Sequence, residues 1–277
     1  MPELFKDKTV ALVGPANYLT LFKKDNENLS KIEECDVVVK LNNGINLSKM
    51  YSNLVSNRID VLYNSLLDNC ANGGILNVED VIKFKIKQII TTPKSDMKGI
   101  AINQKSTNIT NDQTFKKLHL LHNQHNIPTS IVDINLYNFV SSAVKCKPTT
   151  GVVALYDILS QKPKSLYVTG FNFFLSPPLK GYWGAKKENN QKIPYQFSTG
   201  GKTGPLRTEE EHAEVISNSK RHVHKDMWFY AKNTLLNKER VSFDPILKKI
   251  LLLENFSKSD YNNIVLEFKN EKLKKSN

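Results

Sequence analysis

The sequence predicts an α/β fold, with a mostly parallel sheet flanked by helices in a single domain spanning residues 1–277. Three observations lead to this prediction. Short continuous apolar runs recur through the first 170 residues, and such runs are typical of strands buried on both faces. Helical patterns separate several of these runs, which is the alternation that produces a parallel sheet. The chain contains no internal repeat and no convincing linker between domains.

The predicted strands end in glycine or in polar residues. Candidate strands cover residues 9–13, 35–44, 57–66, 86–90, 130–134 and 165–170. The first breaks at Gly14 and Pro15 into a turn that carries Ala16 and Asn17. The next two end in Lys40 and Asn42, and in Asn64 and Ser65. The carboxyl ends of parallel strands share one edge of a sheet, so we expect a ligand cleft there. No GxGxxG fingerprint follows a strand, which counts against an NAD-dependent dehydrogenase.

The chain is organised around residues 146–171, CKPTTGVVALYDILSQKPKSLYVTGF. Pro148 keeps a helix from starting before it, and Thr149 or Thr150 can cap the helix that follows. Gly151 in the first turn leaves the free amide groups uncluttered, and Gly170 closes the next strand. A helix start of this kind favours an anion, because its N–H groups and the helix dipole both attract phosphate.

Three further features are open to a structural interpretation. Asp60 lies beside Arg58, and we expect an ion pair or a cap rather than a catalytic carboxylate. His119, His122 and His125 recur every three residues on a predicted helix, where solvated histidines are commoner than metal ligands. No DxD motif occurs, and we expect no metal site. The segment STGGKTG lacks both the spacing and the preceding strand of a P-loop, so ATP binding is not expected there.

A stretch of irregular composition follows the last predicted strand. Residues 172–206 are rich in proline, glycine, lysine and aromatic residues and show no periodicity. Such a long run inside a compact domain usually forms a lid or a binding loop. Its aromatic and lysine side chains suit a sugar ring and an anionic group.

Composition narrows the function classes. The 39 basic and 27 acidic residues give a net charge of +12, which favours anionic partners such as nucleotides, anionic glycans or nucleic acid. No RNA-binding aromatic signature, zinc finger or basic-region helix accompanies the charge, so we expect no nucleic-acid partner. No run of about 18 apolar residues occurs, and the first residues lack the order of a signal peptide. Three cysteines without metal-like spacing indicate free thiols. These features together predict a cytoplasmic protein without an integral membrane segment.

The motifs together resemble glycosyltransferase family 29, the sialyltransferase family. VALVG, the KLN strand end and NRIDVLYNSL resemble its large sialylmotif, and residues 148–170 resemble the small one, with PTTG for PSTG. The resemblance covers about a third of the chain, with a weaker match near His222. It implies a GT-A-like nucleotide-binding sheet. The missing membrane anchor and inter-motif disulfide of animal members imply a soluble bacterial- or virus-like relative.

The resemblance further implies an inverting, metal-independent transferase that moves a sialic acid or related sugar acid such as Kdo from a CMP donor to a glycan hydroxyl. A histidine would act as general base, since its pKa near 6.5 suits proton removal. His222 aligns best with the H-x4-E motif, where Met227 replaces the glutamate, and His224 is the alternative. The remaining candidate residues, all nucleotide contacts, are Gly14, Pro15, Ala16, Asn17, Asn42, Thr149, Thr150, Gly151, Gly170, Phe171 and Tyr182.

Two departures from the family pattern affect the site. Pro15 and Ala16 replace the family's asparagine-bearing turn, and Asn17 is the possible substitute. Lys40 stands where the family has arginine. The competing hypothesis is a non-catalytic α/β protein that binds anionic glycan or nucleic acid through its positive charge.

Overall fold

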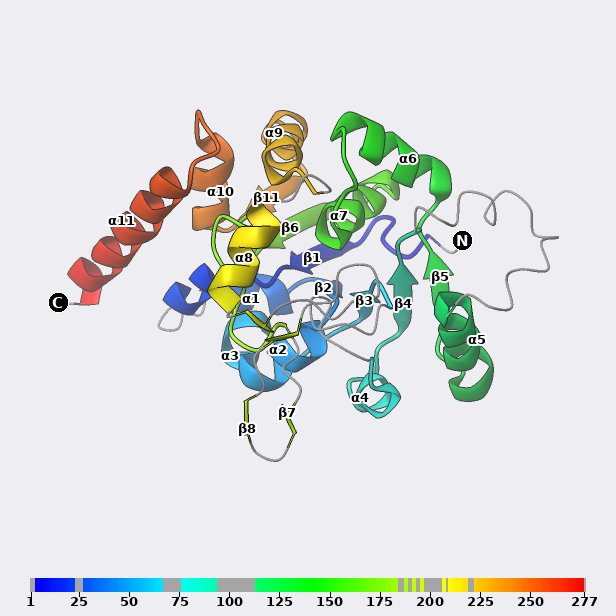
Figure 1. Cartoon of the computed structure of the whole chain (residues 1–277). Helices are drawn as coiled ribbons and strands as arrows, with labels where there is room; N and C mark the ends of the chain where they lie inside the picture. Colours follow the sequence, from blue (N-terminus) through cyan, green and yellow to red (C-terminus); the bar gives the residue numbers. More distant parts are fainter. Residues whose placement is uncertain are drawn as a thin grey trace.

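The computed structural model describes residues 3–22, 27–66, 76–93, 113–183, 187–188, 191–192, 195–196, 206–207, 209–218 and 222–276. Its centre is a seven-stranded sheet in the order β11-β6-β1-β2-β3-β4-β5, in which every neighbouring pair is parallel (Figure 1). The strands are β1 (Thr9–Val13), β2 (Val37–Leu41), β3 (Val61–Tyr63), β4 (Gln88–Thr91), β5 (Thr129–Ile131), β6 (Ser165–Thr169) and β11 (Val241–Phe243). The predicted parallel α/β sheet is therefore confirmed.

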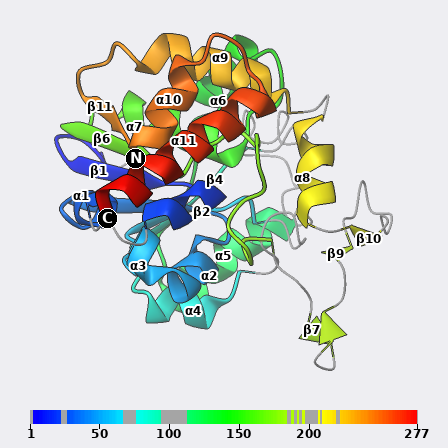
Figure 2. The same cartoon turned by 90° about the vertical axis from the view of Figure 1, so that its left-hand side faces the viewer.

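Helices cover both faces of this sheet. Those of the first half are the 3-10 helix η1 (Asn17–Phe22), α1 (Glu27–Glu33), α2 (Gly44–Met50), α3 (Ser52–Val55), α4 (Val78–Lys83) and α5 (Gln113–His125). Those of the second half are α6 (Ile134–Ala143), α7 (Thr150–Ser160), α8 (Glu209–Ser217), α9 (His224–Leu235), α10 (Pro245–Leu252) and α11 (Lys258–Ser276). Figures 1 and 2 both place α6 and α9 on one side of the sheet and α2, α3 and α4 on the other.

The apolar runs form central strands because both of their faces are covered. Every residue of β2 is buried, and in β1 and β6 only the first residue is partly exposed. Helix α7 is also buried from Gly151 to Ile158, so it lies inside the molecule rather than on its surface. A strand or helix that is apolar on all sides is stable only in such a position.

The centre of the sheet is also the point where the strand order reverses. From β1 the chain builds β2, β3, β4 and β5 outward on one side, and β6 then pairs with the other side of β1. Val13 is in register with Lys40 of β2 and with Thr169 of β6, so the residues after these three positions meet at one edge. Open α/β sheets bind ligands at this type of position.

Glycine is needed where β1 and β6 end side by side. A Cβ atom on Gly14 would lie 2.3 Å from the Gly170 carbonyl oxygen, and Gly170 itself has φ of +74°. A larger residue at position 14 would push the two chain segments apart. Gly14 therefore allows the two strand ends to approach closely.

Several individual predictions can be compared with the structure. Arg58 Nε lies 2.8 Å from Asp60 Oδ2, and Lys87 Nζ lies 2.8 Å from Asp60 Oδ1, which confirms a structural role for this carboxylate. Burial would raise the pKa of Asp60, but bonds from Lys87 and the Val38 amide and the charge of Arg58 lower it. His119, His122 and His125 are exposed on α5.

Three elements differ from the predictions. Strand β11 was not expected, and the predicted strand at 130–134 ends at Ile131, since Ile134 already begins α6. Residues 172–183 pack into the molecule, where Trp183 is 1% exposed. Within residues 172–206 the structure also forms short strands: β7 (Lys187–Glu188), β8 (Gln191–Lys192), β9 (Tyr195–Gln196) and β10 (Leu206–Arg207). STGGKTG and Cys70 lie outside the described residues.

Among the described residues, no helix is both long and apolar enough to cross a membrane. Cys35 and Cys146 are free thiols.

Candidate functional site

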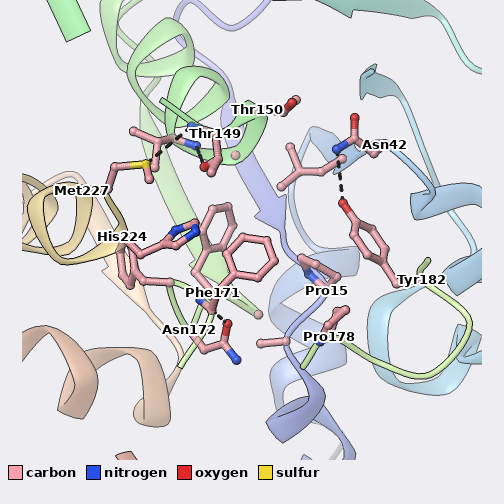
Figure 3. A pocket seen from close by; sticks show the side chains of 17 residues that line it. Pro15, Asn42, Thr149, Thr150, Phe171, Asn172, Pro178, Tyr182, His224 and Met227 are labelled. Carbon is pink, nitrogen blue, oxygen red and sulfur yellow. Dashed lines mark hydrogen bonds between the residues drawn. The ribbon is translucent and has the colours of Figure 1, made fainter. Parts of the chain in front are cut away.

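A cavity with about 620 Å³ of empty space, including the part open to solvent, lies at the carboxyl edge of β1, β2 and β6. Its walls come from the strand ends at 15–16, 41–42 and 170–174, the start of α7 at 149–152, and Pro178, Tyr182, His224 and Met227. In Figure 3, His224, Met227 and Thr149 lie on one side of the cavity, and Asn42 and Tyr182 lie on the other.

The first turn of α7 forms one wall of the cavity. Thr149 is the N-cap, with extended backbone angles, and its side chain accepts a hydrogen bond from the Val152 amide at 3.5 Å. Among the described residues, none accepts a hydrogen bond from the amide of Thr150 or Gly151. These groups have no partner within the helix because they are in its first turn. An anion in the cavity could accept both bonds.

Gly151 provides room for an aromatic ring. A Cβ atom at this position would lie 2.8 Å from the Phe171 ring and 3.1 Å from Leu41. The space that we expected to leave the helix start uncluttered is therefore occupied by Phe171. The ring covers one flank of the helix start and gives the cavity an apolar floor.

A buried carboxylate holds the turn that carries Phe171. Asp244 is fully buried at the end of β11, and it accepts bonds from the Gly170 amide at 3.0 Å and the Tyr18 hydroxyl at 2.8 Å. The Phe171 amide in turn donates to the Tyr18 oxygen at 3.1 Å. Burial raises the pKa of Asp244, although the bonds that it accepts lower it. Sequence reasoning missed Asp244 and Tyr18. The Asp-Pro pair at the start of α10 signals a helix cap but not this contact.

Asn42 and Tyr182 form the opposite wall. The Asn42 side chain donates to the Tyr182 hydroxyl at 3.4 Å and accepts from the Ser65 amide at 3.0 Å. Asn42 has φ of +43°, a left-handed conformation that asparagine tolerates better than most residues. Burial raises the pKa of Tyr182 to about 12, so the hydroxyl keeps its proton and can donate to a ligand.

The two candidate histidines occupy different places. His224 lines the cavity and is 2% exposed, and its buried Nε2 has no hydrogen-bond partner among the described residues. Burial and the neighbouring His222 lower the pKa of His224 to about 3, while a bond to the Ile216 carbonyl opposes this. His222 is not part of the cavity lining, and its Nδ1 lies 2.7 Å from the Lys147 carbonyl oxygen.

Met227 brings α9 against the start of α7. Its sulfur accepts a weak bond from the Thr149 amide at 3.5 Å, and its side chain lines the cavity. Met227 therefore reaches the predicted anion position. A neutral thioether there does not repel an anion, whereas a carboxylate would.

The predicted site residues fall into two groups. Those that line the cavity are Pro15, Ala16, Asn42, Thr149, Thr150, Gly151, Gly170, Phe171, Tyr182 and His224. Gly14, Asn17 and His222 lie outside the lining. Gly14 packs against Gly170, and the Asn17 side chain accepts bonds from Ser176 at 2.7 Å and Tyr261 at 3.2 Å. The side chain offered as a substitute phosphate contact is therefore engaged elsewhere.

Among the described residues, no Lys, Arg, Asp or Glu side chain lines the cavity. Lys40, which stands at the family's arginine position, is 1% exposed and donates to the Ser56 carbonyl at 2.5 Å and to the Ser48 hydroxyl. Burial lowers its pKa to about 7. Within the same residues, no group of three His, Cys, Asp or Glu side chains could hold a metal ion.

Comparison with known proteins gives distant structural matches. No family model matches the chain, and no curated protein matches it. A solved structure of a variant of the sialyltransferase CstII in complex with CMP is 14% identical, with a TM-score of 0.38. That match covers 66% of this chain and 65% of the solved chain, so it spans slightly less than two thirds of CstII.

CstII from Campylobacter jejuni in complex with CMP-3FNeuAc is 12% identical, with a TM-score of 0.39 and 66% of each chain covered. A complex of CstII with a trisaccharide acceptor and CMP is 13% identical, with a TM-score of 0.36, and the match covers 66% of this chain and 68% of that one. Membership of family 29 stays a prediction.

Proposed function

We propose that the protein is a CMP-sugar-dependent glycosyltransferase that moves a sialic acid or a related sugar acid to a glycan hydroxyl, with inversion and without a metal ion. The whole chain, residues 1–277, would be one glycosyltransferase domain, with residues 172–206 partly covering the site. One observation carries the proposal. The start of α7 and His224, whose buried Nε2 has no hydrogen-bond partner among the described residues, line the same cavity, at the edge where the sheet reverses its strand order.

The start of α7 supports binding of the donor phosphate. The free amides of Thr150 and Gly151, the Thr149 and Thr150 hydroxyls and the helix dipole all favour an anion. The Tyr182 hydroxyl, which stays protonated, can donate from the opposite wall. These groups would supply the stabilisation of the leaving phosphate that other transferases obtain from a metal ion.

His224 is the better candidate for the base because it lines the cavity. Its lowered pKa keeps the imidazole uncharged, so the Nε2 lone pair is available to a hydroxyl. An imidazole of such low pKa is a weak base. A bound anionic donor would stabilise the imidazolium and raise the pKa of His224, so the base becomes stronger once the donor is present.

In the proposed step, the acceptor hydroxyl oxygen attacks the anomeric carbon of the donor sugar and forms the new glycosidic bond. The bond from that carbon to the phosphate oxygen breaks, and CMP leaves with the electron pair. The hydroxyl proton passes to Nε2 of His224. His222, which is bonded to the Lys147 carbonyl, would support the position of this segment rather than take the proton.

Ligand-dependent melting tests the binding part of the proposal. CMP and CDP should raise the melting temperature by several degrees in the presence of EDTA, because a ligand at about 100 times its Kd adds about 2.7 kcal/mol. NAD and ATP should have no such effect. Absence of a shift with every cytidine nucleotide would contradict the proposal.

Histidine variants test the chemical part. His224→Ala should lower transfer from CMP-Neu5Ac or CMP-Kdo by about 100-fold or more while CMP binding persists, as expected for loss of a general base. His222→Ala is the matched control and should retain most of the transfer rate. The opposite pattern would make His222 the base. Comparing the two donors also identifies the sugar acid.

A further inference from the structure

The turn that follows Phe171 contains two consecutive aromatic residues in an unfavourable backbone conformation. Phe173 has φ of +50° and Phe174 has φ of +61°. This left-handed region is open to glycine and tolerated by asparagine, whereas a bulky side chain rarely adopts it. Two such residues in succession persist only where the surrounding structure holds them.

A chain of hydrogen bonds holds the turn in this shape. The side-chain carbonyl of Asn172 accepts a bond from the Phe174 amide at 3.1 Å, and its amide nitrogen donates to the Ser176 hydroxyl at 2.6 Å and carbonyl at 3.1 Å. The Ser176 hydroxyl in turn contacts Asn17 at 2.7 Å and Tyr261 at 2.8 Å. The turn is thereby linked to the start of η1 and to helix α11.

The strained conformation places the Phe174 ring against His224. The two ring centroids are 4.7 Å apart, at an interplanar angle of 44°. Phe174 also lies nearly parallel to Trp183, with 6.5 Å between centroids. Both Phe174 and His224 line the cavity, so this contact forms part of its wall.

We propose that the Phe173–Phe174 turn is a positioning element for His224. It holds the Phe174 ring against the imidazole, which keeps water from the imidazole and leaves Nε2 in one orientation for a hydrogen-bond donor on the ligand. That the ligand group is the hydroxyl of the glycan acceptor rests on the proposed function. The positioning of His224 by the turn does not depend on it.

The arrangement is more specific than core packing requires. An unstrained loop could bury an aromatic residue without two left-handed phenylalanines, since burial alone has no preferred direction. The strained backbone directs the Phe174 ring toward the imidazole of His224. That imidazole is buried, and its Nε2 has no hydrogen-bond partner among the described residues. Strain that serves only to orient a side chain at a cavity indicates function.

The test replaces Phe174 by glycine and follows the titration of His224 by NMR in the free protein. Glycine accepts the left-handed backbone and removes the ring. Burial holds the pKa of His224 at about 3 in the native protein, and hydration in Phe174→Gly should raise it above about 4.5, toward the unperturbed value. His224→Gln identifies the resonance among the six histidines. Transfer should fall by about tenfold or more, as expected for a misplaced reacting group.

Lys162→Gly is the matched control. Lys162 is also left-handed, with φ of +54°, but it is exposed and lies outside the cavity lining. This substitution should change neither the His224 titration nor transfer. Phe174→Leu is the replacement test variant if the glycine variant does not fold. It keeps apolar bulk without a ring and should raise the pKa of His224 by a smaller amount.

An unchanged His224 titration in the folded Phe174 variant would overturn the inference. So would a change of equal size in Lys162→Gly. Failure of the proposed function is distinguishable, because it would appear as missing CMP binding or transfer in the native protein, while the titration needs no substrate.

Discussion

The uncharged imidazole of His224 makes the stability of the fold sensitive to acid. Burial and His222 lower its pKa from 6.5 to about 3 in the folded protein. Between these values the unfolded chain binds a proton that the folded chain does not. The free energy of unfolding should therefore decrease as the pH falls below about 6.5, by about 1.4 kcal/mol per pH unit for this group. Urea unfolding at several pH values measures this slope.

The control for this prediction is His224→Gln, which removes the titrating group. Asp157 and Asp244 are buried carboxyl groups with raised pKa values, and they contribute the opposite slope to both proteins. The difference between native protein and variant isolates His224. Equal slopes in both proteins would show that the imidazole protonates as readily in the folded chain as in the unfolded one.

Gly151 offers a second prediction for a single residue. Alanine favours a helix by about 1 kcal/mol over glycine, but here its Cβ atom would lie 2.8 Å from the Phe171 ring. The ring is the side chain able to move, so Gly151→Ala should change the melting temperature little and shift Phe171 into the cavity. We expect the affinity for CMP, measured by calorimetry, to fall about tenfold, which corresponds to about 1.4 kcal/mol of binding free energy.

Gly14→Ala provides the contrast. Its Cβ atom would lie 2.3 Å from a backbone carbonyl, which cannot move without separating β1 from β6. This variant should lose about 1–3 kcal/mol or more of stability, as overpacked cores do. A Gly151→Ala protein that loses stability to the same extent, or binds CMP normally, would contradict the distinction.

At the scale of the element, the N-cap of α7 has two roles that can be separated. Thr149→Ala should cost about 1 kcal/mol of stability through loss of the cap and should also weaken CMP binding, because Thr149 lines the cavity. Asn77 caps α4 in the same way, accepting a bond from the Glu79 amide, and lies outside the cavity lining. Asn77→Ala should therefore lose similar stability without an effect on CMP. Equal CMP affinity in both variants would remove Thr149 from the site.

The central strands could be predicted from the sequence, whereas the edge strand β11 could not. Strands β1, β2 and β6 are continuous apolar runs because both of their faces are covered, and this leaves a clear pattern. Strand β11 has only three residues, of which one is buried, so it produces no recognisable apolar pattern in the sequence. Helices α2 and α3 have seven and four residues. Elements of this length depend on tertiary packing more than on their own propensity.

The site could be predicted where it follows directly from strand ends. Thr149, Gly170 and Asn42 come from the turns that the sequence identifies, and all three line the cavity. The contribution of Asp244 depends on a contact 74 residues distant along the chain, for which the sequence holds no signal. The alignment favoured His222, but only the packing of α9 against α7 distinguishes it from His224.

At the scale of the whole molecule, the described residues keep the positive charge outside the cavity lining. The net charge is +12, yet no charged side chain of the described residues lines the cavity. In the proposed site, the attraction for a phosphate would come from backbone amides and hydroxyl groups, which are fixed dipoles. The charged side chains of the described residues act from outside the cavity lining, and the Debye length at 0.1 M salt is about 10 Å.

This separation predicts a shallow dependence of CMP binding on salt. Between about 50 and 500 mM NaCl the Kd for CMP, measured by calorimetry, should rise less than about threefold, because screening acts on distant charges and not on the dipoles of α7. A protein that binds nucleic acid through six or more phosphate contacts loses about 1,000-fold or more in affinity over a comparable range of salt concentration.

Fluorescence anisotropy with a labelled DNA duplex, measured in parallel, distinguishes the transferase hypothesis from the nucleic-acid-binding hypothesis. Tight, steeply salt-dependent DNA binding together with absent or equally salt-dependent CMP binding would favour a non-catalytic protein that uses its surface charge. A shallow slope for CMP alone favours a transferase whose anion site is built from the backbone.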